Sequence, residues 1–375
     1  MGTYTIYRLK FKTQLHLGRA TGPAQTGKLG LEKTETYIPA DTLFSAICQT
    51  WATFYDTASL TDFLNQYTAE SGTLPFTLTS AFPYADNVYF FPRPLTLRES
   101  KDTPEEVKAE AKKKIKKLQF VSAHLFSHII SGHLPEFSEA KPITITIKGE
   151  KVYAANGEKV WVSAEENKQL NAALRPSNES ENEDITISET ATRPRVTIGA
   201  QNAGSEIWHL QTLQFNKKCG LWFAADFDND ETKHKIETLL RVIGDNGIGG
   251  ERNAGYGAFD FDTASIEIPE AQSSNQFMTL SPICPKSADE LTHLCKGDVA
   301  YTLTPSSGWV SGPGTVARRK QVNMFVEGSV LNTTHETIGR LVDLKPKGHP
   351  HSVYRYGYAW QVRLKGTENE TEIST

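Results

Sequence analysis

The chain has 375 residues, of which 38% are hydrophobic and 10% aromatic, enough apolar material for the cores of two domains. Its formal net charge of −4 excludes a protein that coats nucleic acid through bulk charge, so any contact with RNA or DNA needs a local basic patch. The four cysteines are scattered without a C-x-x-C pair, so we expect neither a zinc ribbon nor a disulfide framework.

The first residues alternate between apolar and polar side chains, as in a strand. Residues 4–12 (YTIYRLKFK) lack the charged start and apolar centre of an export signal. No run of about 18 apolar residues occurs in the sequence, which is the length that a membrane-spanning helix needs. We therefore predict neither export nor membrane insertion, and we expect a cytoplasmic protein.

A strand that ends near Leu15 precedes a glycine-rich loop over residues 16–30, which carries Arg19 and Lys28. The loop should be exposed and adaptable. A helix then begins, with Asp41 as the predicted N-cap. Its core-facing stripe, at helical spacing, is Leu43, Ile47, Trp51 and Phe54.

A charged helix is predicted over residues 104–118, because acidic side chains come first and five lysines follow, an order that suits the helix dipole. This face is either solvated or an RNA track.

Residues 141–187 read as an insertion, and the acidic run 177–184 within it reads as a loop. Strand-like runs over 193–198 and 208–215, joined by turn residues, predict a protruding hairpin.

The most distinctive stretch is GIGGERNAGYG over residues 247–257, which we call the glycine loop. Five glycines in eleven residues permit a backbone that other residues cannot follow, and exposed N–H groups there can face an anion. Arg252 adds a planar charge and Tyr256 a stacking surface. A plain turn that reverses the chain before the next strand explains the same glycines.

Known nucleotide-binding glycine motifs do not match the glycine loop. The dinucleotide fingerprint follows a strand and opens a helix, whereas here a helix comes first, and the Gly-Lys-Ser/Thr of a phosphate loop is absent. We therefore predict no nucleotide cofactor.

The first domain should close near Pro269, after which residues 277–304 again read as strand, helix and strand. The fold class is therefore α+β, with two tandem ferredoxin-like (RRM-like) domains built on antiparallel sheets. We expect an N-terminal domain over 1–269, which contains the insertion and hairpin at about 135–215, and a C-terminal domain over 270–375.

Catalytic and metal motifs are sparse. His124 and His128 lie at i and i+4 on one predicted helix face, a spacing that can bind zinc, with His133 nearby. No acidic residue stands in the His-Glu-x-x-His arrangement, so we predict ordinary histidines and no metal. No Gly-x-Ser-x-Gly elbow or cysteine-protease signature indicates a hydrolase.

His16 is the one candidate catalytic residue. A histidine after the first strand and beside a flexible loop could act as general base on an RNA 2′-hydroxyl. The alternative is a histidine that packs at a strand end.

Separated basic residues in an otherwise acidic chain suit recognition of single-stranded RNA, where cations hold phosphates and flat side chains stack on bases. The candidate cations are Arg19, Lys28, Arg193, Arg195, Arg252, Arg318, Arg319 and Lys320.

An ordered set of motifs resembles the RAMP superfamily of CRISPR effector proteins, and within it subunit four of the type III-A Csm complexes. The motifs are the glycine loop, Leu15-His-Leu-Gly18, Pro39-Ala-Asp-Thr-Leu-Phe-Ser-Ala46, Ser80-Ala-Phe-Pro-Tyr84, Phe91-Pro-Arg-Pro94, Lys116-Lys-Leu-Gln-Phe120, Arg318-Arg-Lys-Gln321, Phe325-Val-Glu-Gly-Ser329 and His349-Pro-His-Ser352. The set covers most of the chain except residues 141–190.

The resemblance implies a non-catalytic subunit that caps the 5′ handle of the guide RNA (crRNA), contacts the large polymerase-containing subunit and abuts the first backbone subunit. It also implies a hairpin "thumb", over residues 193–215, that wedges between guide and target RNA bases. Backbone subunits of the family cleave target RNA with a loop aspartate, and residues 16–36 contain no Asp. We therefore expect no enzyme activity and no cofactor.

The RNA-binding residues that we expect are the eight cations together with His16, Asn202 at the hairpin tip, Gly249, Gly250 and Tyr256. Two other hypotheses remain. One is a metal-independent endoribonuclease that processes guide precursors with His16 as base. The other is a structural scaffold whose glycine loop only turns the chain.

Overall fold

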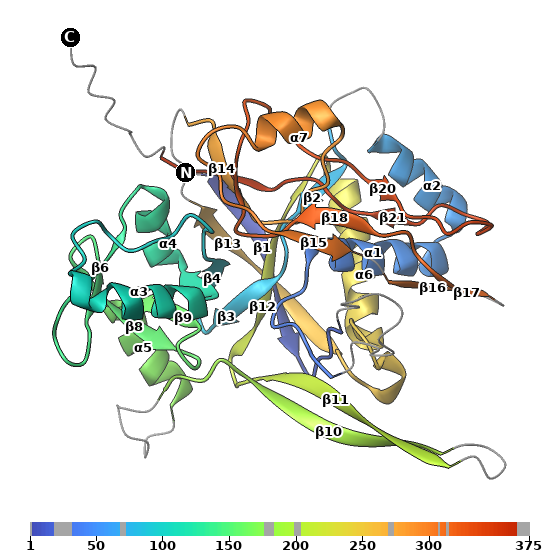
Figure 1. Ribbon diagram of the computed structural model, residues 1–375. Helices are drawn as coiled ribbons and strands as arrows, with labels where there is room; N and C mark the ends of the chain where they lie inside the picture. Colours follow the sequence, from blue (N-terminus) through green and yellow to red (C-terminus); the bar gives the residue numbers. More distant parts are fainter. Residues whose placement is uncertain are drawn as a thin grey trace.

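The computed structural model describes residues 2–18, 32–67, 73–175, 184–198, 204–268, 274–306, 308–312 and 315–365. Figure 1 shows a central sheet with helices on both sides, a lobe on the left of the view and a long hairpin below. Among the helices of the described ranges, none is long and apolar enough to cross a membrane.

Strand β1 (Gly2–Phe11) pairs antiparallel with β12 (Cys219–Phe227) on one side and with the edge strand β13 (Phe259–Ile268) on the other. β3 (Phe82–Ala85) extends the sheet beyond β12, giving the order β13-β1-β12-β3. The adjacent Ile6 and Tyr7 enter different hydrophobic clusters, as the two-residue period of a strand requires. Both faces of the sheet are therefore covered.

Helices α1 (Ala40–Phe54) and α6 (Asp230–Asn246) pack on one face of this sheet, and α2 (Thr57–Gln66) packs on α1. The predicted stripe of α1 is buried through Trp51, but Phe54 is 52% exposed because the helix ends there. The helix follows Pro39, which has no capping side chain, so Asp41 is not the N-cap. It is a buried first-turn residue, and its carboxylate bonds to the C-terminal part of the chain.

A folded extension of the same sheet forms the left lobe of Figure 1, and the predicted insertion over residues 141–187 is only the later part of this extension. Its strands are β4 (Val88–Pro92), β5 (Phe120–Ser122), β6 (Pro135–Phe137), β7 (Ile145–Ile147), β8 (Glu150–Ala155) and β9 (Val160–Ser163). Their order continues β3-β4-β5-β9-β8-β7-β6, and β5 with β9 is the one parallel pair in the described sheets. The helices that cover them are α3 (Glu105–Lys117), α4 (Ala123–Ile130) and α5 (Ala164–Leu174).

The charged helix is α3, whose Lys114 and Lys117 pair with Glu158 while Val107, Ala111 and Ile115 are buried, so the interpretation as a solvated face is the better one. The lobe folds because its strands supply buried apolar side chains such as Ile147 and Trp161. Of the acidic run 177–184, only Asp184 lies within the described residues.

The predicted hairpin consists of β10 (Ser188–Ile198) and β11 (Ser205–Phe215), paired antiparallel over their whole length. It begins five residues before the predicted start at Arg193. Figure 1 shows it extending away from the body of the protein. Val196 and Ile207, which pair with each other, are large apolar residues exposed to solvent.

The C-terminal part is built mainly from short strands. They are β14 (Gln276–Thr279), β15 (Leu303–Ser306), β16 (Trp309–Gly312), β17 (Thr315–Arg318), β18 (Val322–Phe325), β19 (Val330–Asn332), β20 (Val342–Asp343), β21 (Tyr354–Arg355) and β22 (Gln361–Arg363). Three of them form the sheet β19-β14-β22, and the others pair two by two. The described residues from 274 to 365 hold one helix, α7 (Ala288–Leu294), so a second complete β-α-β-β-α-β unit is not seen there.

The two parts of the chain share their hydrophobic cores. Met278 and Trp360 belong to the cluster under the extended sheet, and Tyr356 and Tyr358 belong to the cluster under α1 and α6. The same cluster contains Leu78 of β2 (Phe76–Leu78), a strand that pairs with β12. The C-terminal part therefore uses these side chains to cover the N-terminal part.

A buried carboxylate joins the two parts at their polar centre. Glu327 accepts hydrogen bonds from the hydroxyl of Ser80 and from that of Tyr37, the latter at 2.9 Å. Ser80 in turn accepts the backbone N–H of Ala40 at the start of α1, at 2.8 Å. Burial raises the pKa of Glu327 above its ordinary value near 4.5, although both hydrogen bonds oppose the shift.

We predict that wild type gains stability relative to Glu327→Gln as the pH falls. An acid whose folded-state pKa is raised takes up a proton on folding, so its stabilising effect is complete below pH 4.5 and is lost as pH rises through the folded pKa. Urea denaturation of both proteins between pH 4.5 and 7 measures the difference, expected at about 1.4 kcal/mol for each unit of pKa shift. Glu165→Gln, at an exposed site on α5, is the control. A constant difference between wild type and Glu327→Gln would contradict the prediction.

Candidate nucleic-acid interface

The glycine loop lies directly against residues 14–17, the segment after β1. The N–H of Gly250 donates to the His16 carbonyl oxygen at 2.9 Å, and the N–H of Gly257 donates to the Gln14 carbonyl oxygen at 2.8 Å. A Cβ atom on Gly249 would overlap the His16 oxygen, and one on Gly257 would overlap the Ile248 oxygen. For these glycines, the close approach that the sequence indicates is made by the chain itself.

His16 is 2% exposed, and its Nδ1 lies 2.7 Å from the carbonyl oxygen of Gln211 on β11. Since a carbonyl only accepts, Nδ1 carries the proton, and the ring is held between the glycine loop and the hairpin base. The burial of the ring favours the interpretation as a packed strand-end histidine over the general-base interpretation.

A cleft of about 870 Å³ runs between the glycine loop, the exposed side of α1 and the C-terminal part. Its volume is within the range of about 300–1,000 Å³ that is typical of ligand sites. Of the predicted site residues, the structure brings five to its walls: His16, Gly249, Gly250, Arg252 and Arg319. We call this hollow the interdomain cleft.

An ion pair forms one wall of the interdomain cleft. Arg355 Nη1 lies 2.8 Å from Asp41 Oδ2, and the Ser306 hydroxyl donates to the same oxygen at 3.2 Å. Both charged side chains are largely buried, so the pair connects α1 to β21. The Asp41 carboxylate is therefore already bonded within the protein, to Arg355 and to Ser306.

Arg319 lies beside this pair and, unlike Arg355, makes no ion pair among the described residues. Its Nε, like that of Arg355, is buried and has no hydrogen-bond acceptor there. Burial, reinforced by the neighbouring Arg355 and opposed by Asp41, lowers the pKa of the Arg319 guanidinium to about 10. The group still carries its charge at neutral pH, so the interdomain cleft contains a cation that an incoming anion would stabilise.

A second contact links the glycine loop to the hairpin. Arg195 on β10 donates through Nη2 to the Tyr256 hydroxyl at 3.1 Å, and its guanidinium lies 5.8 Å from the centre of the Tyr256 ring. Tyr256 is 8% exposed. This burial does not favour the expected stacking of Tyr256 on a base, and it makes the residue a point of attachment between hairpin and loop.

The other predicted residues lie elsewhere. Arg193 is exposed on β10, Arg318 pairs in register with Trp309 in the β16–β17 hairpin, and Lys320 is exposed just after it. Arg19, Lys28 and Asn202 lie outside the described residues.

Sequence reasoning missed several residues of this region. The sequence pattern indicates only a strand at Arg355 and only a cap at Asp41, although both lie in or near motifs on which the family resemblance rests. His351 also lines the interdomain cleft.

A second, basic hollow lies at the base of the hairpin, where lysines 217 and 218 approach lysines 10 and 12. Only the folded chain brings these residues together.

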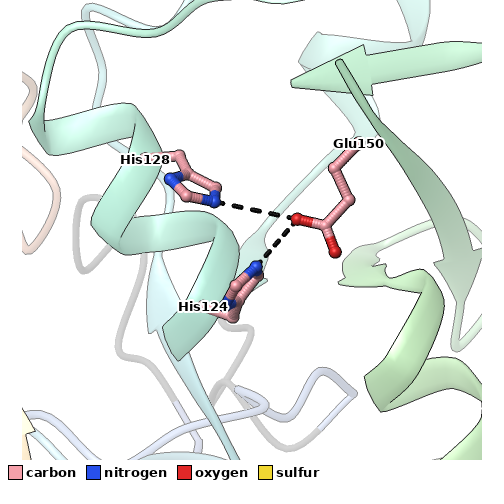
Figure 2. A group of neighbouring side chains, drawn as sticks. All are labelled: His124, His128 and Glu150. Carbon is pink, nitrogen blue, oxygen red and sulfur yellow. Dashed lines mark hydrogen bonds and ion pairs between the residues drawn. The ribbon is translucent and has the colours of Figure 1, made fainter. Parts of the chain in front are cut away.

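A possible metal-binding group lies away from the interdomain cleft. His124 and His128 on α4 face Glu150 of β8, the acidic partner that the sequence pattern lacked (Figure 2). Burial first, and then the nearby cations, lower the pKa of His128, with Glu150 opposing the shift.

We predict that Gly257→Ala destabilises the protein much more than Gly255→Ala. Both glycines have positive φ, which costs about 1–2 kcal/mol for alanine, but a Cβ on Gly255 meets nothing within 4 Å. The overlap with Ile248 should add about 1–3 kcal/mol at position 257. Urea denaturation measures both changes in the free energy of unfolding, and equal changes would show that the backbone approach to Ile248 is not tight.

We predict opposite effects on stability for the two cleft arginines. Arg319→Met should leave the free energy of unfolding unchanged or raise it by about 1 kcal/mol, because a half-buried cation whose Nε has no acceptor among the described residues is removed. Arg355→Met should lower it by about 3–5 kcal/mol, because Asp41 stays buried without its partner. Thermal and urea denaturation distinguish the two, and similar decreases would contradict this assignment of roles.

Comparison with known proteins agrees with this architecture. Residues 272–364 match the family model described as the CRISPR Csm4 C-terminal domain. The protein described as CRISPR system Cms protein Csm4 from Streptococcus thermophilus is 24% identical over 94% of this chain and 96% of its own length. The protein of the same description from Thermococcus onnurineus is 22% identical, over 87% and 91%.

Solved structures show the same fold. The crystal structure of a Csm3–Csm4 subcomplex of the type III-A CRISPR-Cas interference complex contains a chain that matches with a TM-score of 0.63 and 17% identity, over 97% of this chain and 100% of that one. A Csm1–Csm4 cassette in complex with pppApA contains a chain that matches with a TM-score of 0.55 and 17% identity, over 98% and 100%. The RAMP superfamily model matches residues 8–260, more than half of the chain. The chain therefore belongs to the RAMP superfamily.

Proposed function

We propose that this protein is the subunit of a type III-A CRISPR (Csm) complex that binds the 5′ handle of the guide RNA in the interdomain cleft. The observation that carries the proposal is Arg319, whose buried Nε has no acceptor among the described residues and which lies in one hollow with Arg252 of the glycine loop. The relatives that match this chain along most of its length bear the name of the Csm4 subunit.

The charge of the interdomain cleft supports an anionic ligand. Three carboxylates line it, those of Glu35, Asp41 and Glu327. Two of them are already bonded within the protein, Asp41 to Arg355 and Glu327, with a raised pKa, to Ser80. Arg252 is exposed, and Arg319 lies among charged neighbours without an acceptor for its Nε in the described part of the chain. An RNA phosphate would meet these two cations, and guanidinium groups suit phosphate geometry.

The hairpin supports the thumb assignment. We propose that β10 and β11 form the thumb and that the exposed pair Val196 and Ile207 contacts bases where guide and target RNA pair. Apolar side chains inserted at base steps can separate them. Arg195 connects this hairpin to the glycine loop and so to the interdomain cleft.

The proposal extends to the way in which the chain divides into two units. We propose that residues 1–269 form a ferredoxin-like unit, since the order β13-β1-β12-β3 with α1 and α6 matches the β-α-β-β-α-β pattern. Residues 270–375 would be a reduced second unit around β19-β14-β22 and α7.

The proposed partners are those of the relatives. Solved complexes place proteins of this fold with Csm3 and with Csm1. We propose that this chain likewise joins the large polymerase-containing subunit to the first backbone subunit. The role would be non-catalytic, since His16 is buried and residues 16–36 contain no Asp.

We predict that Arg252→Ala combined with Arg319→Met weakens binding of a 5′-handle RNA by at least about tenfold, because each charged hydrogen bond to phosphate contributes about 1.5–3 kcal/mol. The slope of log affinity against log salt concentration should decrease in magnitude by about 0.7 for each phosphate that the variant no longer neutralises. Filter binding at several salt concentrations measures both quantities. The RNA should be recovered intact after incubation in EDTA.

The matched control is Lys168→Met, which removes an exposed cation on α5, in the lobe on the left of Figure 1. Unchanged binding and guide retention by the cleft variant would refute the site. Cleavage of precursor RNA that depends on His16 would replace the proposal with the endoribonuclease hypothesis.

A further inference from the structure

The group formed by His124, His128 and Glu150 lies in the lobe on the left of Figure 1, on a part of the molecule that the proposed RNA site does not use. His124 and His128 are one turn apart on α4, and Glu150 is the first residue of β8. Figure 2 shows both imidazoles turned toward one carboxylate. Three potential ligands thus come from two elements that are separate in the sequence.

The distances between the donor atoms suit a shared cation. Glu150 Oε2 lies 2.7 Å from His124 Nε2 and 3.7 Å from His128 Nε2. All three donor atoms lie within 4.8 Å of one another. Tetrahedral zinc with bonds of about 2.0–2.2 Å separates its ligand atoms by roughly 3.3–3.6 Å, so small side-chain rotations would complete the site.

The surroundings leave room for an ion to enter. The side chains of His124 and Glu150 are 48% and 30% exposed, whereas that of His128 is 18% exposed. The neighbouring His133 does not belong to this group of donor atoms. The protein therefore supplies three ligands, and a fourth position faces solvent.

The chemistry of the ligands selects the cation. Two imidazoles and one carboxylate suit Zn²⁺ and its transition-metal neighbours, whereas Ca²⁺ and Mg²⁺ prefer oxygen alone. A hydrogen-bonded His–Glu pair accounts for His124, but it leaves His128 Nε2 beyond hydrogen-bond distance of the same oxygen. A bound cation would engage both imidazoles at once.

We propose that His124, His128 and Glu150 form a Zn²⁺ site with three protein ligands and one water. The ion would fasten α4 to β8, two elements of the folded extension, independently of RNA binding. Its role would be to stabilise this lobe, since it connects α4 directly to β8, two elements that contribute side chains to the same hydrophobic cluster.

The test uses the full chain, stripped of metal with EDTA and titrated with Zn²⁺ against a chromophoric chelator. Wild type should bind one Zn²⁺ at a site whose affinity falls at least about tenfold in His124→Gln, His128→Gln and Glu150→Gln. Co²⁺ should give the visible spectrum of a four-coordinate ion in wild type and lose it in Glu150→Gln. Zn²⁺ should raise the melting temperature of wild type but not of Glu150→Gln.

Two controls match the variants in chemistry. His133→Gln removes the neighbouring imidazole, and the double variant His349→Gln, His351→Gln removes a second histidine pair, whose Nε2 atoms lie 3.2 Å apart. Both should keep the wild-type affinity. The proposal is overturned if the ligand variants bind Zn²⁺ as tightly as wild type, or if the His349 and His351 variant alone loses the ion. Because His124 and Glu150 are partly exposed, their variants should fold, and circular dichroism checks this.

Discussion

The structure depends on polar contacts that hold its two parts against one sheet. Glu327 from the C-terminal part is buried and bonded to Ser80 and Tyr37, and Asp41 at the start of α1 is paired with Arg355. Buried charges are costly unless they are bonded, so these groups permit only a narrow range of relative positions for the two parts. The interdomain cleft exists because this placement leaves a hollow beside α1.

The glycine loop shows how a fold requirement and a proposed binding role share one segment. Gly249 and Gly257 allow close contact with the chain's own backbone, at His16 and at Ile248, so their small size serves the fold. Arg252 remains exposed at the turn that these glycines create. In this view, the loop contributes to RNA binding mainly by where it places Arg252 and the cleft wall, and its backbone N–H groups contribute less than the sequence suggested.

Four of the motifs that resemble the RAMP family meet at the joint between the two parts. Ser80 and Glu327 come from two of them and bond to each other, and Asp41 lies in a third. Arg319 comes from a fourth and stands in the cleft that the joint creates. The resemblance therefore rests on residues that fix the architecture as well as on residues that we propose to meet RNA.

The sequence by itself determined the local elements and the family. Alternation in β1, the stripe Leu43, Ile47 and Trp51 in α1, and the acid-first charge order of α3 depend only on neighbours a few residues away. Only the tertiary structure decided which distant residues meet. Asp41 and Arg355, His124 and Glu150, and Arg319 and the glycine loop are each brought together by strand pairing and core packing, which no local pattern records. The folding of residues 141–187 into a sheet extension was decided in the same way, because its strands are stable only beside β5 and under their helices.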